Sequence, residues 1–454
     1  MRYIGAFNNE MGGAGVRLCS RRLMRRPTPE PVPVPNVASG RPVWLRVGTL
    51  LDGTSTLPRR DAHVVYDAGE IRFVGDSGRT PPPSVLRPGQ GAPDVDAPDA
   101  TLLPGLIDAH AHLFLAGGEL DTEARAAALR QSPAQLLAAA MPRLEPLVRL
   151  GIAGDRDAGD KDGVGLALSR HCHASSRPLM PYLDSPGAAI HRFGRYGSFM
   201  GEPLEDHPSA AACVAARVAA GADRIKLIPT GIINYAKGAV TTAPQMSAAE
   251  IGQCVAAARA SERQTFAHAS GDAGIDHAIA GDVDSIEHGF FVRDDQLARL
   301  RDAQIAWVPT FAAVQAQVDH AGRLGWPAHV VDNLRRILDR HAASLAAAHA
   351  LGVLVIAGSD AGSYGVPHGL GLLDELLLME RAGLPPIAVI NAATGVSAGR
   401  LAYREPLGRI KVGRRSRFIV TRHSPLETVA NLRQPRTVIF DGEVFSSCVD
   451  ASGL

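Results

Sequence analysis

Short apolar segments alternate with longer Ala- and Leu-rich segments through the middle of the chain. The apolar segments are rich in aliphatic and β-branched residues and are bounded by Gly, Pro or Asp, as strands are. The segments between them, such as residues 132–150 and 247–260, carry apolar residues at helical spacing. Together they predict eight strand-then-helix units between about Leu102 and Gly399. The eight predicted strands lie at residues 101–112, 151–157, 179–184, 224–230, 264–270, 285–289, 305–310 and 353–360.

Eight such units over roughly 250 to 300 residues fit a (β/α)8 barrel, or TIM barrel, whose active site lies at the C-terminal ends of its strands. An open, doubly wound sheet is the alternative, because alternation alone does not show that the strands close into a ring. Such a sheet would need a glycine-rich phosphate-binding turn after the first strand, whereas this chain has His110 and His112 there. We therefore predict an α/β fold with a TIM barrel over residues 102–404.

The two ends of the chain have a similar sequence pattern, which differs from that of the middle. Residues 43–101 and 405–454 contain short alternating or apolar runs separated by Gly and Asp, which is typical of strands and hairpins. We predict that both ends combine into one small composite β-domain, a β-sandwich. Residues 1–42 are rich in Arg and Pro and lack the apolar run of a secretory signal, so we expect a disordered tail there.

The charge balance restricts the partners that this chain can have. With 47 basic and 46 acidic residues, its formal net charge of +1 provides no field to attract nucleic acid or an acidic membrane surface. The longest uncharged stretch, residues 341–359, is broken by His349 and Gly352, so no membrane span is expected. Five widely spaced cysteines favour a reduced, cytoplasmic location. We expect a small-molecule substrate; a homo-oligomer is compatible with the sequence, although no interface stripe stands out.

Residues of metal-ligand type recur at the ends of the predicted strands. His110 and His112 lie two apart on the first strand, so both side chains face the same side and can hold one cation. The fourth, fifth, sixth and eighth strands supply Lys226, His268, His288 and Asp360. Each of these alone is more often structural, but together they converge on one rim of the predicted barrel. Four imidazoles and a carboxylate suit zinc or a similar cation.

Lys226 is the unusual member of this set, because an ammonium group has no lone pair for a metal. The chain contains 4 lysines among its 47 basic residues, so a lysine between two apolar strand residues needs an explanation. A buried, neutral amine can take up carbon dioxide and become a carbamate, which is a carboxylate able to bridge two ions. The alternative is an ion pair between Lys226 and Asp360 or Asp108.

The segments PGLIDAHAH, IKLIPTG, FAHASG, SIEHG and AGSDAG resemble, in this order, the metal motifs of the amidohydrolase superfamily. The resemblance extends over roughly residues 43–445 and is strongest to the imidazolonepropionase-like and Xaa-Pro dipeptidase-like branch, whose members carry a lysine on the fourth strand. It implies two divalent metal ions, for which we expect Zn²⁺. Carried over residue by residue, it implies that one ion is held by His110, His112 and Asp360, the other by His268 and His288, and that carboxylated Lys226 bridges both.

The chemistry implied by these metals is hydrolysis of a C–N amide bond in a small molecule by a metal-bridging hydroxide, since metals lower the pKa of bound water. Asp360 is the expected catalytic residue, which takes a proton during attack and passes it to the leaving nitrogen. We expect a dipeptide or an N-acyl amino acid as substrate, and a cyclic amide or imidazolone ring as the next choice. A mononuclear deaminase of the same superfamily is disfavoured by Lys226. A non-catalytic barrel is disfavoured by the cost of burying six such residues without metal.

The substrate loops depart from the pattern of the resembled branch. Where relatives often have Gly-Gly-His-Gly after the third strand, this chain reads AIHRFGRYGSFMG, and Ile232 and Ile233 replace part of a Thr-Gly-Gly turn after the lysine strand. The pocket is therefore expected to differ from that of relatives. The residues predicted to contact substrate are His191, Arg195, Tyr196, Tyr235 and His368. Asp155 and Asp157 are expected to hydrogen-bond to ligand histidines.

Overall fold

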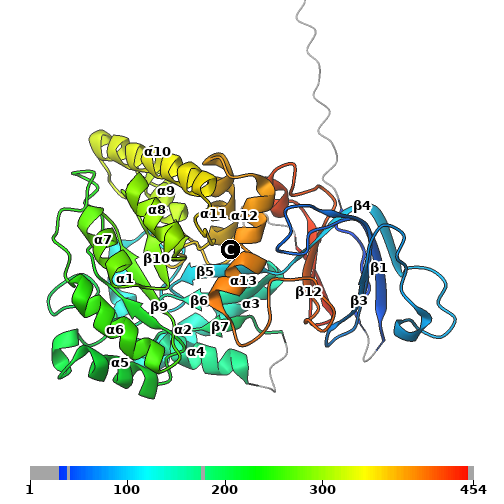
Figure 1. Cartoon of the computed structure of the whole chain (residues 1–454), viewed down its shortest axis with the longest axis horizontal. Coiled ribbons are helices and arrows are strands. Elements are labelled where there is room, and N and C mark those ends of the chain that lie inside the picture. Colours follow the sequence, from blue (N-terminus) through cyan, green and yellow to red (C-terminus); the bar gives the residue numbers. More distant parts are fainter. Residues whose placement is uncertain (1–29, 38–40, 175–178, 448–454) are drawn as a thin grey trace, which may run out of the picture.

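The structure is a computed structural model that describes residues 30–37, 41–174 and 179–447. Figure 1 shows a sheet built from both ends of the chain beside a larger part in which helices surround short strands. The sheet has the order β14-β13-β12-β4-β1-β2-β3, with β1 and β4 parallel and the other neighbours antiparallel. Its strands are β1 (Val43–Leu50), β2 (Arg59–Tyr66), β3 (Ile71–Gly75), β4 (Val95–Pro104), β12 (Arg417–Thr421), β13 (Arg436–Phe440) and β14 (Glu443–Ser447).

The prediction of a composite domain from both termini is confirmed by this sheet, but the prediction of a sandwich is wrong. The N-terminal and C-terminal strands meet at β4, which pairs with β1 on one side and with β12 on the other. A single ladder of backbone hydrogen bonds therefore joins all seven strands into one mixed sheet. Tyr66 and Phe418, one from each end of the chain, pack edge to face in its core with ring centroids 4.9 Å apart.

Residues 30–37 lie against this sheet, although they fall within the segment expected to be a tail. Val32 is buried, and its carbonyl accepts a hydrogen bond from the Thr437 hydroxyl. The backbone N–H of Val37 donates to the carbonyl of Gly442. Residues 1–29 and 38–40 lie outside the described part of the chain.

Gly105 separates the sheet from the larger part of the molecule. The segment 101–112, predicted as one strand, divides there into the end of β4 and β5 (Leu106–Ala111). A Cβ atom on Gly105 would lie 2.7 Å from the Cβ of Ala153, so no larger residue fits without a shift. At Gly105 the chain leaves β4 of the sheet and enters β5, which carries His110.

The parallel strands form two groups, with orders β5-β6-β7 and β11-β10-β9-β8. They are β6 (Ile152–Asp157), β7 (Tyr182–Asp184), β8 (Ile225–Leu227), β9 (Thr265–Ala269), β10 (Ser285–His288) and β11 (Ala306–Val308). The eighth predicted strand, residues 353–360, has isolated parallel bridges instead of a regular ladder, at Trp307 with Val355 and just beyond it at Ala111 with Ala361. A further bridge joins Ile190 to Leu227 of β8. Seven of the eight predicted segments therefore contain strands, and the eighth makes bridges to β5 and β11.

Helices follow the strands, as the alternation predicts. They are α1 (Thr122–Leu129), α2 (Pro133–Ala140), α3 (Leu144–Arg149), α4 (Val164–His173), α5 (Ala210–Ala219), α6 (Ala248–Ala260), α7 (Asp272–Ala280), α8 (Asp294–Asp302), α9 (Phe311–Asp319), α10 (Ala328–Leu351), α11 (Leu370–Arg381), α12 (Pro386–Ala392) and α13 (Gly395–Leu401). Capping boxes at Ser132 and Ser247 start α2 and α6, and Gly352, with φ of 78°, ends α10. Within the described ranges, no helix combines the length and the hydropathy needed to cross a membrane.

Candidate metal centre

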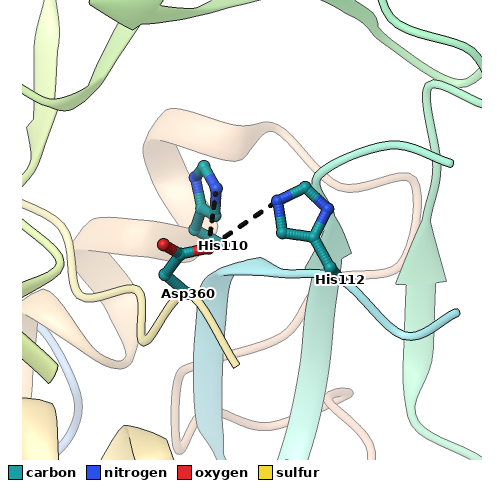
Figure 2. A group of neighbouring side chains, drawn as sticks. All are labelled: His110, His112 and Asp360. Carbon is teal, nitrogen blue, oxygen red and sulfur yellow. Dashed lines mark ion pairs between the residues drawn. The ribbon is translucent and has the colours of Figure 1, made fainter. Parts of the chain in front are cut away.

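His110, His112 and Asp360 form the tightest group of ligand-type side chains among the described residues. One ligand atom from each lies within 4.8 Å of the others. Figure 2 shows the two imidazoles converging on the carboxylate, whose Oδ1 lies 3.7 Å from Nε2 of His110 and 3.6 Å from Nε2 of His112. The histidines come from the end of β5, and Asp360 follows the eighth predicted strand. These three atoms leave space for a cation between them.

The other three predicted ligands adjoin this group. The His288 ring at the end of β10 lies 5.0 Å from the His110 ring and 4.4 Å from the His268 ring on β9. Lys226 lies on β8, next to β9. Burial is the main cause that lowers the pKa of all four imidazoles, and the charge of Lys226 lowers it further. The strand ends thus bring six side chains predicted from the sequence to one place.

The Nδ1 atom of three imidazoles, those of His110, His112 and His288, has a hydrogen-bond partner. That of His110 lies 2.6 Å from a carboxylate oxygen of Glu287, and that of His112 lies 3.0 Å from the carbonyl oxygen of Gly159. Because these partners only accept, the proton is on Nδ1 and the lone pair of Nε2 faces the centre.

The other two imidazoles are held in a similar way. His288 places Nδ1 at 2.8 Å from the Thr310 hydroxyl. His268 hydrogen-bonds to the backbone of Gly231 and has no partner at Nε2. This arrangement, in which an outer partner fixes each ring, is the one that orients histidine ligands at metals.

Burial determines the protonation of the centre. It lowers the pKa of His112 and His268 to about 3 and that of His110 and His288 well below 6.5, so the imidazoles are neutral at pH 7. It raises the pKa of Asp360 to about 7. Neutral imidazoles, and a carboxyl group that loses its proton near neutral pH, are suitable donors for a divalent cation.

Lys226 is a buried amine without a counter-ion. Its side chain is 2% exposed, and Nζ has no hydrogen-bond partner among the described residues. The alternative ion pair with Asp360 or Asp108 is not formed within 4.0 Å in the described part of the chain; Nζ instead lies 4.7 Å from the centre of the Phe266 ring. Burial lowers the pKa of Lys226 to about 8, so a substantial fraction of the amine is neutral near physiological pH.

Backbone geometry at the strand ends is specialised. His288, Thr310 and Asp360 have φ of 67°, 53° and 56°, in the left-handed region that non-glycine residues rarely adopt. Two of these residues are candidate ligands, and the third holds the Nδ1 of His288. Strained backbone of this kind concentrates at functional sites, where surrounding packing holds it.

A buried polar network holds the candidate ligands His110 and Asp360 in position. Arg156 donates to both carboxylate oxygens of Glu287, at 2.9 and 2.8 Å, and Glu287 in turn fixes His110. Asp108 accepts hydrogen bonds from the backbone N–H and the hydroxyl of Ser359, the residue before Asp360. Through Glu287 and Ser359, this network positions His110 and Asp360.

The expectation that Asp155 and Asp157 hydrogen-bond to ligand histidines is wrong. Asp157 accepts from Leu113 N and Ser185 Oγ, and neither carboxylate oxygen of Asp155 has a partner among the described residues. Strand alternation explains the difference, because Arg156 between them takes the position that faces Glu287.

Two of the predicted substrate residues, Arg195 and Tyr196, line a cavity of about 320 Å³. The other lining residues are Gly231, Ile232, Ile233, Asn234, Thr241, Thr242 and Gln245. Tyr196 connects the cavity to the centre, since its ring lies 5.0 Å from that of His268. The charge of Asp360 raises the pKa of both Tyr196 and Tyr235, so both phenols lie near that carboxylate, although burial is the larger cause.

The two predicted substrate histidines are engaged in backbone hydrogen bonds. Both ring nitrogens of His191 lie near carbonyl oxygens, of Arg192 at 3.0 Å and of Gly201 at 2.9 Å, which leaves the ring no polar atom for a substrate. His368 uses Nε2 for the carbonyl of Leu115, at 2.9 Å, and its Nδ1 has no partner among the described residues. His191 therefore shapes its loop, whereas His368 keeps an acceptor near the centre.

Arg125 and Glu287 are near the centre but are not among the residues predicted from the sequence. Glu287 lies in the SIEHG segment, where its position next to His288 is a usable signal. Arg125 lies on α1, among alanines, and nothing in that segment marks it. Its approach to Gly362 depends on tertiary packing that a linear pattern does not reveal.

Comparisons with known proteins agree with this geometry. A profile described as "Amidohydrolase family" matches residues 101–445. An ochratoxinase of Aspergillus niger is 25% identical over 449 residues, which cover 92% of this chain and 88% of the relative. An imidazolonepropionase of Pseudomonas aeruginosa is 33% identical over 152 residues, 29% of this chain and 34% of the relative. A solved Xaa-Pro dipeptidase with bound methionine in its active site has the same fold, with a TM-score of 0.71, 24% identity and coverage of 89% of this chain and 100% of that chain.

Proposed function

The chain belongs to the amidohydrolase family, whose profile covers residues 101–445, and from this premise we propose that it is a metal-dependent hydrolase of a C–N amide bond in a small molecule. The observation that carries the proposal is a set of four neutral imidazoles around a buried lysine amine that has no partner among the described residues. Three of the imidazoles are held at Nδ1 and the fourth by the backbone of Gly231. Such a set has little structural use without cations, because unpaired buried polar groups destabilise a fold.

We infer that the eight strand-then-helix units close into a barrel. The isolated parallel bridges support closure, because they connect Val355 to β11 and Ala361 to β5, while Ile190 connects the chain beyond β7 to β8. A closed ring of parallel strands would place all six predicted ligands at its C-terminal rim.

The donor set fits two divalent cations, for which Zn²⁺ is the leading choice. His110, His112 and Asp360 would hold one ion, and His268 and His288 the other. Lys226 would bridge both after its neutral amine adds carbon dioxide and releases a proton to give a carbamate. When bound, the cations lower the pKa of a water molecule and polarise the substrate carbonyl.

Asp360 is the proposed proton carrier. Burial raises the pKa of Asp360 to about 7 in the metal-free chain. With the cations bound, the ionised carboxylate would take a proton as water attacks and return it to the leaving nitrogen. The phenols of Tyr196 and Tyr235 stay protonated, since burial raises their pKa values, and they can donate hydrogen bonds to substrate oxygens. The products are an amine and a carboxylic acid.

A dipeptide or an N-acyl amino acid is the leading substrate. The fold-level likeness to a Xaa-Pro dipeptidase supports the first of these. A cyclic amide or imidazolone-type ring is the second candidate, supported by the 33% identity to an imidazolonepropionase over 152 residues. A mononuclear deaminase is disfavoured, because it would leave Lys226 without a role.

The test combines metal analysis with a substrate panel. The protein is stripped with a chelator, reconstituted with Zn²⁺ and assayed on N-acyl amino acids, Xaa-Pro dipeptides and lactams. We expect two bound ions per chain and metal-dependent release of an amine from at least one class. A protein that binds no divalent ion, or that hydrolyses amides equally well without one, would contradict the proposal.

A further inference from the structure

A second functional feature lies beside the centre, at Arg125 on α1. Its guanidinium donates to the carbonyl oxygens of Ala116, at 3.0 Å, and of Gly362, at 2.7 Å. It also lies over the Tyr364 ring, 4.2 Å from the ring centre. The loop after His112 and the loop after Asp360 are therefore joined through this one side chain.

The contacts that hold Arg125 are neutral. No ion pair within 4.0 Å involves Arg125 in the described ranges. Buried Arg436 and part-buried Arg143 also have none there, whereas Arg156 and Arg417 have carboxylate partners. Arg156 pairs with Glu287 at 2.8 Å, and Arg417 pairs with Asp441 at 2.8 Å. A partly buried guanidinium without a counter-ion is costly unless an anion joins it during function.

The surroundings bring this guanidinium close to the centre. Arg125 adjoins Gly362, two residues beyond Asp360, and Gly362 is so close to His112 that a Cβ there would lie 2.5 Å from the His112 carbonyl oxygen. Burial lowers the pKa of Arg125, whereas Tyr364 and, to a smaller extent, the Asp360 and Glu119 carboxylates raise it. Arg143, another guanidinium near this loop, donates to Leu113, but burial alone is what lowers its pKa.

An arginine has five N–H donors in a planar fork, and the two carbonyls and the Tyr364 side chain use only part of them. Tyr364 and the carbonyls fix the plane of the fork, which favours bidentate binding of a carboxylate. The cavity lined by Tyr196 and Ile232 adjoins the centre at His268, whose ring lies 5.0 Å from that of Tyr196. An extended substrate could place an acyl group there and its carboxylate at Arg125.

We propose that Arg125 binds the free carboxylate of the substrate, which makes this chain selective for N-acyl amino acids and dipeptides over amides that lack that carboxylate. This inference rests on the proposed function, because it names the substrate class of the same site. Arg125 would act on substrate binding and orientation, and Tyr364 would position it.

The experiment uses substrate pairs that differ only in the carboxylate: N-acetyl-L-phenylalanine with N-acetylphenethylamine, and L-alanyl-L-proline with L-alanylpyrrolidine. Each is assayed with the Zn²⁺-reconstituted wild type and with Arg125→Met, Arg125→Lys and Tyr364→Ala. Arg130→Met is the matched control, because Arg130 is an exposed arginine at the end of the same helix.

We expect Arg125→Met to lower kcat/KM for the carboxylate substrates by roughly 10- to 100-fold, mainly through KM, and to change the decarboxylated analogues less than about threefold. Arg125→Lys should keep part of the preference, since it retains charge but not the fork. Tyr364→Ala should raise KM for the carboxylate member of each pair. Equal losses on both members of a pair would show that Arg125 only holds the two loops, and would overturn the inference.

Binding of the unreacted probes separates this inference from the proposed function. If the wild type hydrolyses no amide, the proposed function fails, but calorimetric titration with N-acetyl-L-phenylalanine still tests Arg125. We expect binding that weakens at least tenfold in Arg125→Met and is unchanged in Arg130→Met. Equal affinity of wild type and Arg125→Met, or no binding to either, would overturn the inference. Thermal unfolding of each variant identifies one that fails to fold, in which case Arg125→Lys decides.

Discussion

Lys226 lies where no other cationic side chain would serve the proposed chemistry. An arginine would stay charged and could not form a carbamate, whereas the pKa of Lys226 is lowered to about 8 by burial. We predict that Lys226→Ala abolishes hydrolysis and reduces bound metal, because both ions lose a shared ligand. A short carboxylic acid added in trans should restore part of the activity by occupying the vacated space. The measurements are kcat/KM and metal content, each with and without the added acid.

The control for this prediction is Lys411→Ala, since Lys411 is exposed. It should retain wild-type metal content and activity. A Lys226→Ala protein that is metal-free and fully active would contradict the scheme. An Asp360→Ala protein that is metal-free and fully active would show that Asp360 is not the proton carrier.

The residues of the candidate site could be selected from the sequence, but their surroundings could not. His110 and His112 are visible because strand alternation relates residues two apart. The carbonyls that hold Arg125 and the acceptor that holds His112 belong to residues distant in sequence or to the backbone, which carries no sequence signal. For the same reason the sequence predicts His191 as a substrate contact, although both of its ring nitrogens lie close to backbone carbonyl oxygens.

The eighth strand segment passes very close to β5, and Gly358 makes this possible. A Cβ on Gly358 would lie 2.6 Å from a methyl group of Val308 and 2.8 Å from the Cβ of His110. We predict that Gly358→Ala destabilises the protein by about 1–3 kcal/mol, as overpacked cores do, and weakens metal binding because Asp360 lies two residues further on. Chemical unfolding and chelator competition measure the two effects.

Gly252 on α6 provides the contrasting substitution. A Cβ there meets nothing within 4 Å, so Gly252→Ala should stabilise the protein by about 0.5–1 kcal/mol through helix propensity. Metal affinity should not change. If Gly358→Ala behaved like Gly252→Ala, the close approach of this segment to β5 would not matter for the centre.

Helix α10 packs on the strands through a buried histidine. His341 stacks on Phe290 at 4.0 Å between ring centres and hydrogen-bonds through Nε2 to the carbonyl of Pro309 at 2.9 Å. Burial lowers its pKa from 6.5 to about 4. The unfolded chain therefore binds this proton below pH 6.5 but the folded chain only below about 4, so stability is fully present above pH 6.5 and is lost as pH falls towards 4.

We predict that His341→Phe flattens this part of the pH profile. The wild type should lose about 3 kcal/mol at this site between pH 6.5 and 4, a loss that Phe cannot show because it binds no proton. At pH 7 the variant should be less stable by about 1 kcal/mol, since the hydrogen bond to Pro309 is missing. Urea unfolding at pH 7, 5.5 and 4.5 gives the difference in unfolding free energy between the two proteins. The other histidines contribute equally to both proteins, so their effect cancels in this difference. Parallel pH profiles for the two proteins would contradict the assignment.

Element positions follow from the sequence where hydrophobic periodicity is local. Helix α6 begins and ends within one residue of the predicted segment 247–260 because a capping box and apolar spacing mark it. The division of the first predicted strand at Gly105 is not visible, since both halves are equally apolar. The eighth segment lacks a regular ladder for a reason outside its own sequence: it bridges to β11 and β5 at different points.

At the scale of the whole molecule, the sequence predicts which segments come together but not how the sheet is built. Both chain ends read as strands, so a shared domain could be expected. The choice between one sheet and two facing sheets depends on β4 pairing with both β1 and β12, and pairing partners leave no mark in a single sequence. The order of the parallel strands is simpler, because sequential units lie next to one another.

The last prediction concerns the stability of the whole chain without metal. Nε2 of His110, Nε2 of His268 and Nζ of Lys226 are buried without a hydrogen-bond partner among the described residues. A ligand that binds only the folded chain stabilises it by mass action. An ion held at 1,000 times its Kd contributes about 4 kcal/mol, which corresponds to roughly 4 °C in Tm for a chain of this length. Chelation should therefore lower Tm by several degrees for two ions, and Zn²⁺ should restore it. Lys226→Ala should show a smaller response to chelation, whereas Lys411→Ala should respond like the wild type. A Tm that does not respond to chelator in the wild type would mean that the cluster is a polar network that holds no metal.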